Sequence, residues 1–135
     1  MLANDRLKFR AWCHSSRTML EWSEVKEHFY TLGWDEIMFD LTLMQFTTTY
    51  DANGTPIYEG DIITDMTDPD DGHWVVVWSP ISMAFMFGRL QHDPRDDNYF
   101  KFEHPEDYLQ DNVSPTDVVV GNIFENEELL YVNLE

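Results

Sequence analysis

The sequence has few basic residues, a single cysteine and no long hydrophobic run. Lys and Arg number 8 against 26 Asp and Glu, so the 135-residue chain has a formal charge of -18. Direct binding of DNA or RNA is therefore disfavoured, because it relies on Lys and Arg to displace counterions from phosphates. With only Cys13, an internal disulfide and a cysteine-based zinc site are excluded. No apolar run approaches the roughly 20 residues that cross a bilayer, and residues 1–10 lack the apolar segment of a signal peptide. We expect no membrane contact and a cytoplasmic location.

The negative charge is concentrated after Tyr50. Residues 1–50 contain seven acids and five bases, a net charge of -2, whereas residues 51–135 contain nineteen acids and three bases, a net charge of -16. An anionic surface of this kind attracts and steers a positively charged partner. The charge pattern therefore predicts a protein partner with a basic surface.

Most of the chain has the pattern of short strands. Period-2 alternation predicts a strand over 7–12, and residues of high β propensity predict strands over 41–48, 56–58, 62–64 and 117–124. Between residues 51 and 54, an Asn-Gly pair predicts a tight turn with positive φ angles. Two further strands, 74–78 and 81–87, are predicted to form a hairpin joined by Ser79-Pro80.

Helices are predicted to be few and short. Thr18 and Glu21 fit a capping box in front of a helix over 23–30. Pro105–Leu109 resembles one helical turn, and Asn126 is placed to cap another over 127–130. Residues 91–98 are rich in acids, Pro and Asn, and we expect them to lie at the surface. Six or more short strands with turns between them predict a mainly β fold, a small antiparallel barrel or sandwich.

Five segments in order resemble the YopX family of phage and prophage proteins. They are KFRAW (8–12), LMQFT (43–47), DANGTPIYEGDII (51–63), VVVWSPISMAFMF (75–87) and VVVGNIFENEELL (118–130). The resemblance implies an SH3-like barrel with additional strands and one or two short helices. It also implies an accessory protein that acts inside an infected bacterium. The family has no established catalytic residues, so no site is carried over.

We predict a single domain over residues 1–135. Its N-terminal strand and short helix occupy residues 1–40, and a barrel-like β core with the C-terminal strand occupies residues 41–135. Two departures from the family pattern are specific to this chain. Cys13 and His14 follow the first segment, and an acidic loop lies at residues 65–72.

Candidate catalytic groups have simpler interpretations. Asp61 follows Gly60 in a turn, where its carboxylate is expected to accept backbone N–H groups. Cys13 and His14 are adjacent on a strand and so point to opposite faces. The acidic loop does not have the spacing of an EF-hand. A site from His92, His104 and the neighbouring aspartates matches no metal motif. We therefore predict no catalytic residue, no cofactor and no metal.

The leading hypothesis is a non-catalytic accessory protein that binds through its acidic surface. That surface could mimic DNA and block a host DNA-binding or defence protein. Two alternatives stay open: a structural barrel that self-associates into a homo-oligomer, and a divalent-metal-dependent hydrolase. The predicted binding residues are all aspartates: Asp65, Asp68, Asp70, Asp71, Asp93, Asp96 and Asp97.

Overall fold

The chain forms two compact units, described here each by itself. In this computed structural model, unit 1 comprises residues 1–48 and unit 2 residues 49–135. The residues that it describes are 7–33, 35, 39–67, 73–80, 82–88, 90–93, 96–102, 107–108 and 113–129. The single domain predicted over residues 1–135 stays a prediction.

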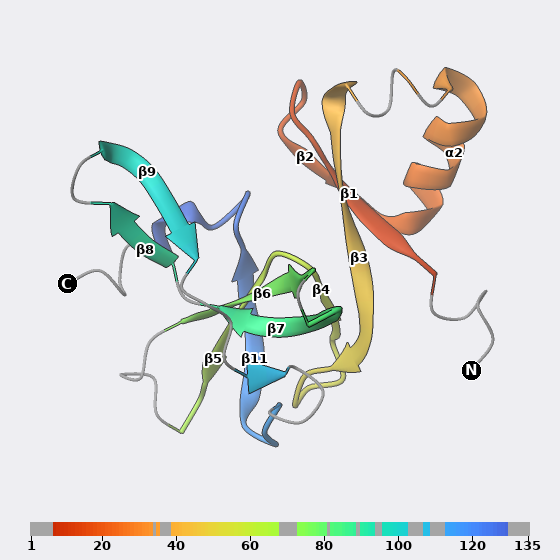
Figure 1. Ribbon diagram of the computed structural model, residues 1–135. Helices are drawn as coiled ribbons and strands as arrows, with labels where there is room; N and C mark the ends of the chain where they lie inside the picture. Colours follow the sequence, from red (N-terminus) through yellow and green to blue (C-terminus); the bar gives the residue numbers. More distant parts are fainter. Residues whose placement is uncertain are drawn as a thin grey trace. The chain divides into compact units, whose positions relative to one another are not determined.

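Unit 1 is a small antiparallel sheet with one face covered by a helix (Figure 1). Its strands pair in the order β2-β1-β3, and its elements are β1 (Phe9–Cys13), β2 (Thr18–Leu20), α2 (Trp22–Leu32) and β3 (Leu41–Tyr50). The covered face contains Ala11, Leu20 and Leu41, which pack with the fully buried Val25 of α2. The strands predicted over 7–12 and 41–48 and the helix predicted over 23–30 are confirmed.

The start of α2 differs from the prediction. Glu21, not Thr18, is the N-cap residue, and its backbone N–H donates to Glu24 Oε1 at 3.2 Å. Thr18 instead pairs with Cys13 as the first residue of β2. The Thr-x-x-Glu pattern of residues 18–21 does not mark the start of the helix, because the short strand β2 comes directly before it. Glu21 and Glu24 form the capping box instead.

Unit 2 has the strand order of an SH3-like barrel. Its main sheet has the strand order β10-β7-β6-β5-β11. Strands β5, β6, β7 and β10 are successive neighbours in the sheet, and β11 pairs with β5 on the other side. All of these pairings are antiparallel. The strands are β4 (Pro56–Tyr58), β5 (Asp61–Asp65), β6 (Trp74–Ser79), β7 (Ala84–Gly88), β10 (Asp107–Tyr108) and β11 (Asp117–Asn122). The predicted mainly β, SH3-like antiparallel fold is confirmed.

A separate hairpin lies between β7 and β10 in the sequence. It consists of β8 (Leu90–Asp93) and β9 (Asp96–Phe102). The sequence patterns do not predict these two strands, because edge strands accommodate charged residues that a core strand excludes. The surface position predicted for residues 91–98 stays a prediction. The helical turn predicted over Pro105–Leu109 is wrong at Asp107–Tyr108, which pair with β7.

Apolar side chains cover both faces of the main sheet. On one face, Ile57, Ile63, Val76 and Phe87 form a buried cluster. On the other, Ile62 and Val75 are covered by side chains that include Ile123 and Leu129. Leu129 belongs to a 3₁₀ turn over residues 127–129, where its N–H donates to Asn126 O at 3.0 Å. This turn agrees with the helical turn predicted after Asn126.

Candidate functional site

Asp51 ties the turn between β3 and β4 to strand β11. Its Oδ1 accepts the N–H groups of Asn53 and Thr55 at 2.9 and 2.8 Å, and its Oδ2 accepts the N–H of Val119 at 2.9 Å. Gly54 completes the turn with a φ of 79°, a value that an L side chain rarely adopts. The carboxylate of Asp51 is buried and engaged in structural hydrogen bonds.

Asp61 holds the turn between β4 and β5. Its Oδ2 accepts the N–H of Tyr58 at 2.7 Å, which confirms the structural role predicted from the sequence. The preceding Gly60 has a φ of 86°. Its N–H donates to Val76 O at 2.8 Å, and its carbonyl accepts the N–H of Ile123 at 3.0 Å.

Asn122 organises the chain after β11. Its Oδ1 accepts the N–H groups of Phe124 and Glu125 at 3.0 and 2.9 Å, and its Nδ2 donates to Glu125 Oε1 at 2.9 Å. Asn126 Oδ1 accepts the N–H of Asn122 at 3.1 Å. A Cβ on Gly121 would lie 2.4 Å from that same Oδ1, so only glycine fits here. We call Asp51, Asp61 and Asn122 the three turn anchors.

Of the seven aspartates predicted to bind a partner, Asp65 has a described side chain. It lies at the end of β5, directly opposite Asp117 of β11. Its Oδ1 accepts the N–H and hydroxyl of Thr67 at 2.9 and 2.7 Å and the hydroxyl of Thr116 at 2.8 Å. Asp117 Oδ2 accepts the N–H of Ser114 at 2.8 Å. Carboxylates that face each other across a sheet repel each other. Here nearby hydrogen-bond donors stabilise each of the two carboxylates.

The other six predicted residues fall into two groups. Asp68, Asp70 and Asp71 lie outside the described residues. Asp93 and Asp96 are opposite each other where β8 meets β9, and Asp97 follows on β9. The backbone thus brings these three acids to one end of a hairpin. Binding by all seven aspartates stays a prediction.

Exposed acids follow the last turn anchor. Glu125, Glu127 and Glu128 are all exposed, and the hydrogen bond from Asn122 Nδ2 fixes the carboxylate of Glu125. Asp51 and Asp61, by contrast, are buried. The fold therefore separates buried structural carboxylates from carboxylates that a partner could reach.

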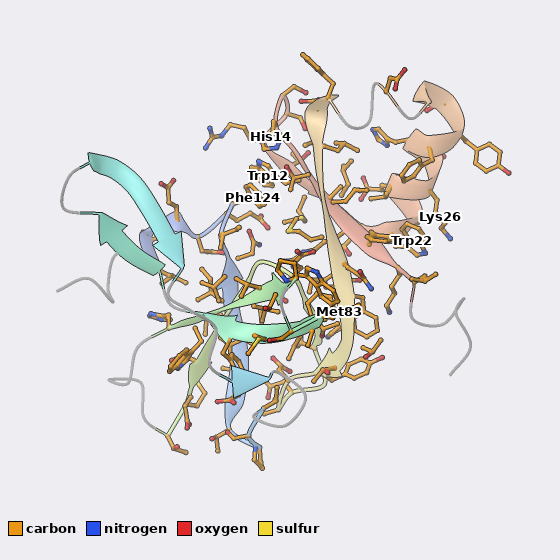
Figure 2. The ribbon with its side chains drawn as sticks, viewed as in Figure 1. Trp12, His14, Trp22, Lys26, Met83 and Phe124 are labelled. Atoms are coloured by element: carbon orange, nitrogen blue, oxygen red, sulfur yellow. The ribbon has the colours of Figure 1, made fainter. Side chains whose placement is uncertain are left out.

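Exposed apolar side chains lie at the end of the β6–β7 hairpin, where Figure 2 labels Met83 of the connecting turn. Trp78 and Phe85 are register partners, and their rings pack edge to face with centroids 5.1 Å apart. Trp78 is 45% exposed and Met83, in the connecting turn, is 76% exposed. We call Trp78, Met83 and Phe85 the hairpin-tip patch.

The hairpin itself was only partly predicted. Strand β7 begins at Ala84, opposite Ser79, so residues 80–83 connect the strands instead of Ser79-Pro80. The alternation that was extended to Met83 fails there, because Met83 has a φ of 52° and belongs to the turn.

Cys13 lies in a polar cluster at the end of β1. Its Sγ is 3.3 Å from Asp40 Oδ2, to which it donates, and 3.5 Å from Ser15 Oγ. The Ser15 hydroxyl is the main cause of a lowered pKa at Cys13, and the same hydroxyl lowers the pKa of Asp40. His14 is directed elsewhere, with its Nε2 2.7 Å from Thr42 Oγ1. The prediction that Cys13 and His14 do not form a pair is confirmed.

The model of the YopX protein family matches residues 8–131. The chain belongs to the YopX family. No curated protein matches it. Among solved structures, the crystal structure of protein EF1440 from Enterococcus faecalis is similar at 25% identity, covering 92% of this chain and 97% of that one with a TM-score of 0.48.

The YopX-like segments and the turn anchors coincide. Asp51, Gly60 and Asp61 lie in the 51–63 segment, and Gly121 and Asn122 lie in the 118–130 segment. The side chains of Asp51, Asp61 and Asn122 accept backbone N–H groups of turns. Gly60 has a positive φ, and Gly121 lies too close to Asn126 for a Cβ. These five residues of the YopX-like segments are thus explained by folding.

Metal binding and membrane insertion each require a feature that can be looked for in the structure. In the part of the chain that the structure describes, no three His, Cys, Asp or Glu residues are grouped so as to hold a metal ion. Within those same residues, no helix has the length and apolar character needed to span a bilayer.

Sequence reasoning missed the hairpin-tip patch as a unit. Trp74 and Trp78 are four residues apart in β6, so both lie on the face of the strand that contains Val76. Trp74 packs against Phe87, with ring centroids 6.2 Å apart, whereas Trp78 lies at the open end of the hairpin. The available signal was the position of Trp78 beside the turn.

Proposed function

We propose that this YopX-family protein is a non-catalytic binding protein whose unit 2 recognises a basic partner protein. In the sharper form of the proposal, its carboxylates take the place of DNA phosphates on a host DNA-binding or defence protein. It would act as a phage or prophage accessory protein in the bacterial cytoplasm.

The charge of unit 2 is the observation that carries the proposal. Its nineteen acids exceed its three bases, so unit 2 has a net charge of -16. Such an excess opposes folding through self-repulsion and favours a positively charged partner. The binding of that partner would relieve the repulsion.

The placement of the described acids supports the same function. Asp51 and Asp61 are buried and accept backbone N–H groups, so removing them would damage the fold. Glu127 and Glu128 are exposed. Exposed carboxylates can be replaced by amides of nearly the same size without disturbing a turn anchor, so recognition and folding can be tested separately.

The test is an affinity capture from bacterial lysate with the full chain as bait. At about 0.1 M salt, where electrostatic interactions extend over about 10 Å, we expect basic DNA-binding proteins to be enriched. At about 1 M salt the range falls to about 3 Å, and these proteins should elute. If the proteins recognise the bait as a DNA mimic, short duplex DNA should displace them.

Two amide variants provide the matched comparison. Glu127→Gln with Glu128→Gln removes two exposed acids of unit 2, and Glu27→Gln with Asp35→Asn removes two exposed acids of unit 1. We expect the first pair to weaken capture and the second to leave it unchanged. Equal capture by both variants, or a captured set that contains no basic protein, contradicts the proposal.

A further inference from the structure

Met83 combines two unfavourable features at the tip of the β6–β7 hairpin. Its φ of 52° lies in the left-handed region, which is costly for any residue with a Cβ. Its side chain is also 76% exposed, so the strain is not offset by burial. A glycine would remove the strain and the exposed apolar surface together. Strain without a folding benefit is a feature of binding sites.

The two strand ends that flank the turn of Met83 also carry apolar side chains. Trp78 and Phe85 pack edge to face beside the turn, and nearly half of Trp78 is accessible. The tip is ordered, because the Ser82 N–H donates to Ser79 Oγ at 3.2 Å. A rigid aromatic pair beside a flexible thioether suits the anchoring of an apolar side chain.

Charge decides between a second copy of the chain and a different partner. Two copies joined at this patch would bring together two units that each have a net charge of -16, and repulsion would oppose their association. A positively charged segment is attracted instead. The hydrogen bond from Gly60 N–H to Val76 O places the turn that contains Glu59 alongside β6, the strand of Trp78. An arginine can stack on the Trp78 ring within about 6 Å of its centroid.

We propose that the hairpin-tip patch is the apolar anchor for a partner segment in which arginine or lysine residues flank an apolar side chain. This rests on the proposed function and adds to it: the acidic surface supplies attraction, and Trp78, Met83 and Phe85 supply specificity for sequence. Acidic residues alone would bind any basic chain equally well.

The test uses three synthetic peptides of equal length and the full protein. In one, arginine alternates with leucine; in the second, arginine alternates with serine; in the third, glutamate alternates with leucine. Binding is followed by the Trp78 indole N–H resonance in NMR spectra, assigned with Trp78→Phe. We expect the arginine–leucine peptide to shift this resonance and to bind at least about tenfold more tightly than the arginine–serine peptide.

Variants separate the patch from general effects. Trp78→Ser and Met83→Gly should each lower the affinity for the arginine–leucine peptide toward that of the arginine–serine peptide. Tyr30→Ser, which removes a 93% exposed aromatic residue of unit 1, should leave the affinity unchanged. Met83→Gly protects the comparison from misfolding, because glycine is favoured at that φ.

The outcomes distinguish this inference from the proposed function. Equal affinity for both arginine peptides with an unmoved Trp78 resonance overturns the anchor and leaves acidic recognition standing. No binding of either arginine peptide contradicts both. Equal binding of the glutamate–leucine peptide overturns the role of charge. Sedimentation showing a dimer that Met83→Glu dissociates assigns the patch to a second copy and also overturns the inference.

Discussion

The carboxylate of Asp51 accepts the backbone N–H of Val119 at 2.9 Å, although the two residues are 68 positions apart in the sequence. The same side chain organises its own turn through Asn53 and Thr55. One aspartate thus joins a local turn to the strand that returns to β5. Backbone N–H groups that lose such an acceptor inside a fold carry a desolvation cost.

Replacing Asp51 with alanine should destabilise unit 2 by about 2–3 kcal/mol, because three N–H groups lose their acceptor. Asp51→Asn keeps one side-chain oxygen and should cost less. Urea unfolding followed by circular dichroism measures both free energies of unfolding. A change below about 0.5 kcal/mol for Asp51→Ala, the range of an ordinary surface substitution, would show that the link to Val119 is dispensable.

Gly121 and Asn126 should behave as a coupled pair. Gly121→Ala places a Cβ 2.4 Å from Asn126 Oδ1, and overpacking of this kind costs about 1–3 kcal/mol. In the double variant with Asn126→Gly, which also removes the Asn126 Cβ, the clash is relieved, so its loss of stability should be smaller than the sum of the two single losses. Thermal and urea unfolding of all four proteins gives the coupling. Additive losses would mean that the close approach is not what requires glycine.

Met83→Gly should stabilise the protein while it weakens binding at the hairpin-tip patch. Removing the Cβ from a residue in the left-handed region gains about 1–2 kcal/mol, and the greater flexibility of glycine in the unfolded chain returns about 0.5–1 kcal/mol. The expected net gain is about 0.5–1 kcal/mol in urea unfolding. Ser82→Gly, at a neighbouring position without a positive φ, is the control and should not stabilise. A destabilised Met83→Gly would show that the methionine side chain supports the fold.

Ser15→Ala should raise the pKa of Cys13. The Ser15 hydroxyl is the main cause of the lowered pKa, since it stabilises the thiolate, and the side chain and backbone of Ser16 act in the same direction. The pH midpoint of iodoacetamide alkylation, followed by mass spectrometry, should therefore move upward in Ser15→Ala. Ser23→Ala, on the exposed surface of α2, should leave the midpoint in place. An unmoved midpoint in Ser15→Ala would assign the shift to another group.

The same hydroxyl affects stability through Asp40. It lowers the pKa of Asp40, as does the Cys13 thiol less strongly. The ionised Asp40 carboxylate therefore adds to the free energy of unfolding at pH values above the ordinary aspartate pKa. This contribution is lost as the pH falls through the lowered pKa. Ser15→Ala should make unit 1 less sensitive to that acid range, which pH-dependent unfolding of the two proteins can check.

Local patterns predicted most strands but not the contacts between distant segments. Alternation and β propensity located β1, β3 and β6, and the Gly60-Asp61 turn was correctly interpreted because its hydrogen bond spans three residues. The contact of Asp51 with Val119 depends on the sheet order, which no local window contains. The β8–β9 hairpin was not predicted because its composition is that of exposed chain. The exposure of Trp78 depends on its position near the end of β6. The alternation of side chains along a strand does not specify where the strand ends.

The three turn anchors use backbone N–H groups as their main partners, and backbone groups are the same whatever side chains surround them. Substitutions at exposed positions such as Glu127, Trp78 or Met83 therefore leave the anchors intact. Residues at such positions can therefore change one at a time without rebuilding the barrel. Proteins that share these turns need not share the side chains exposed around them.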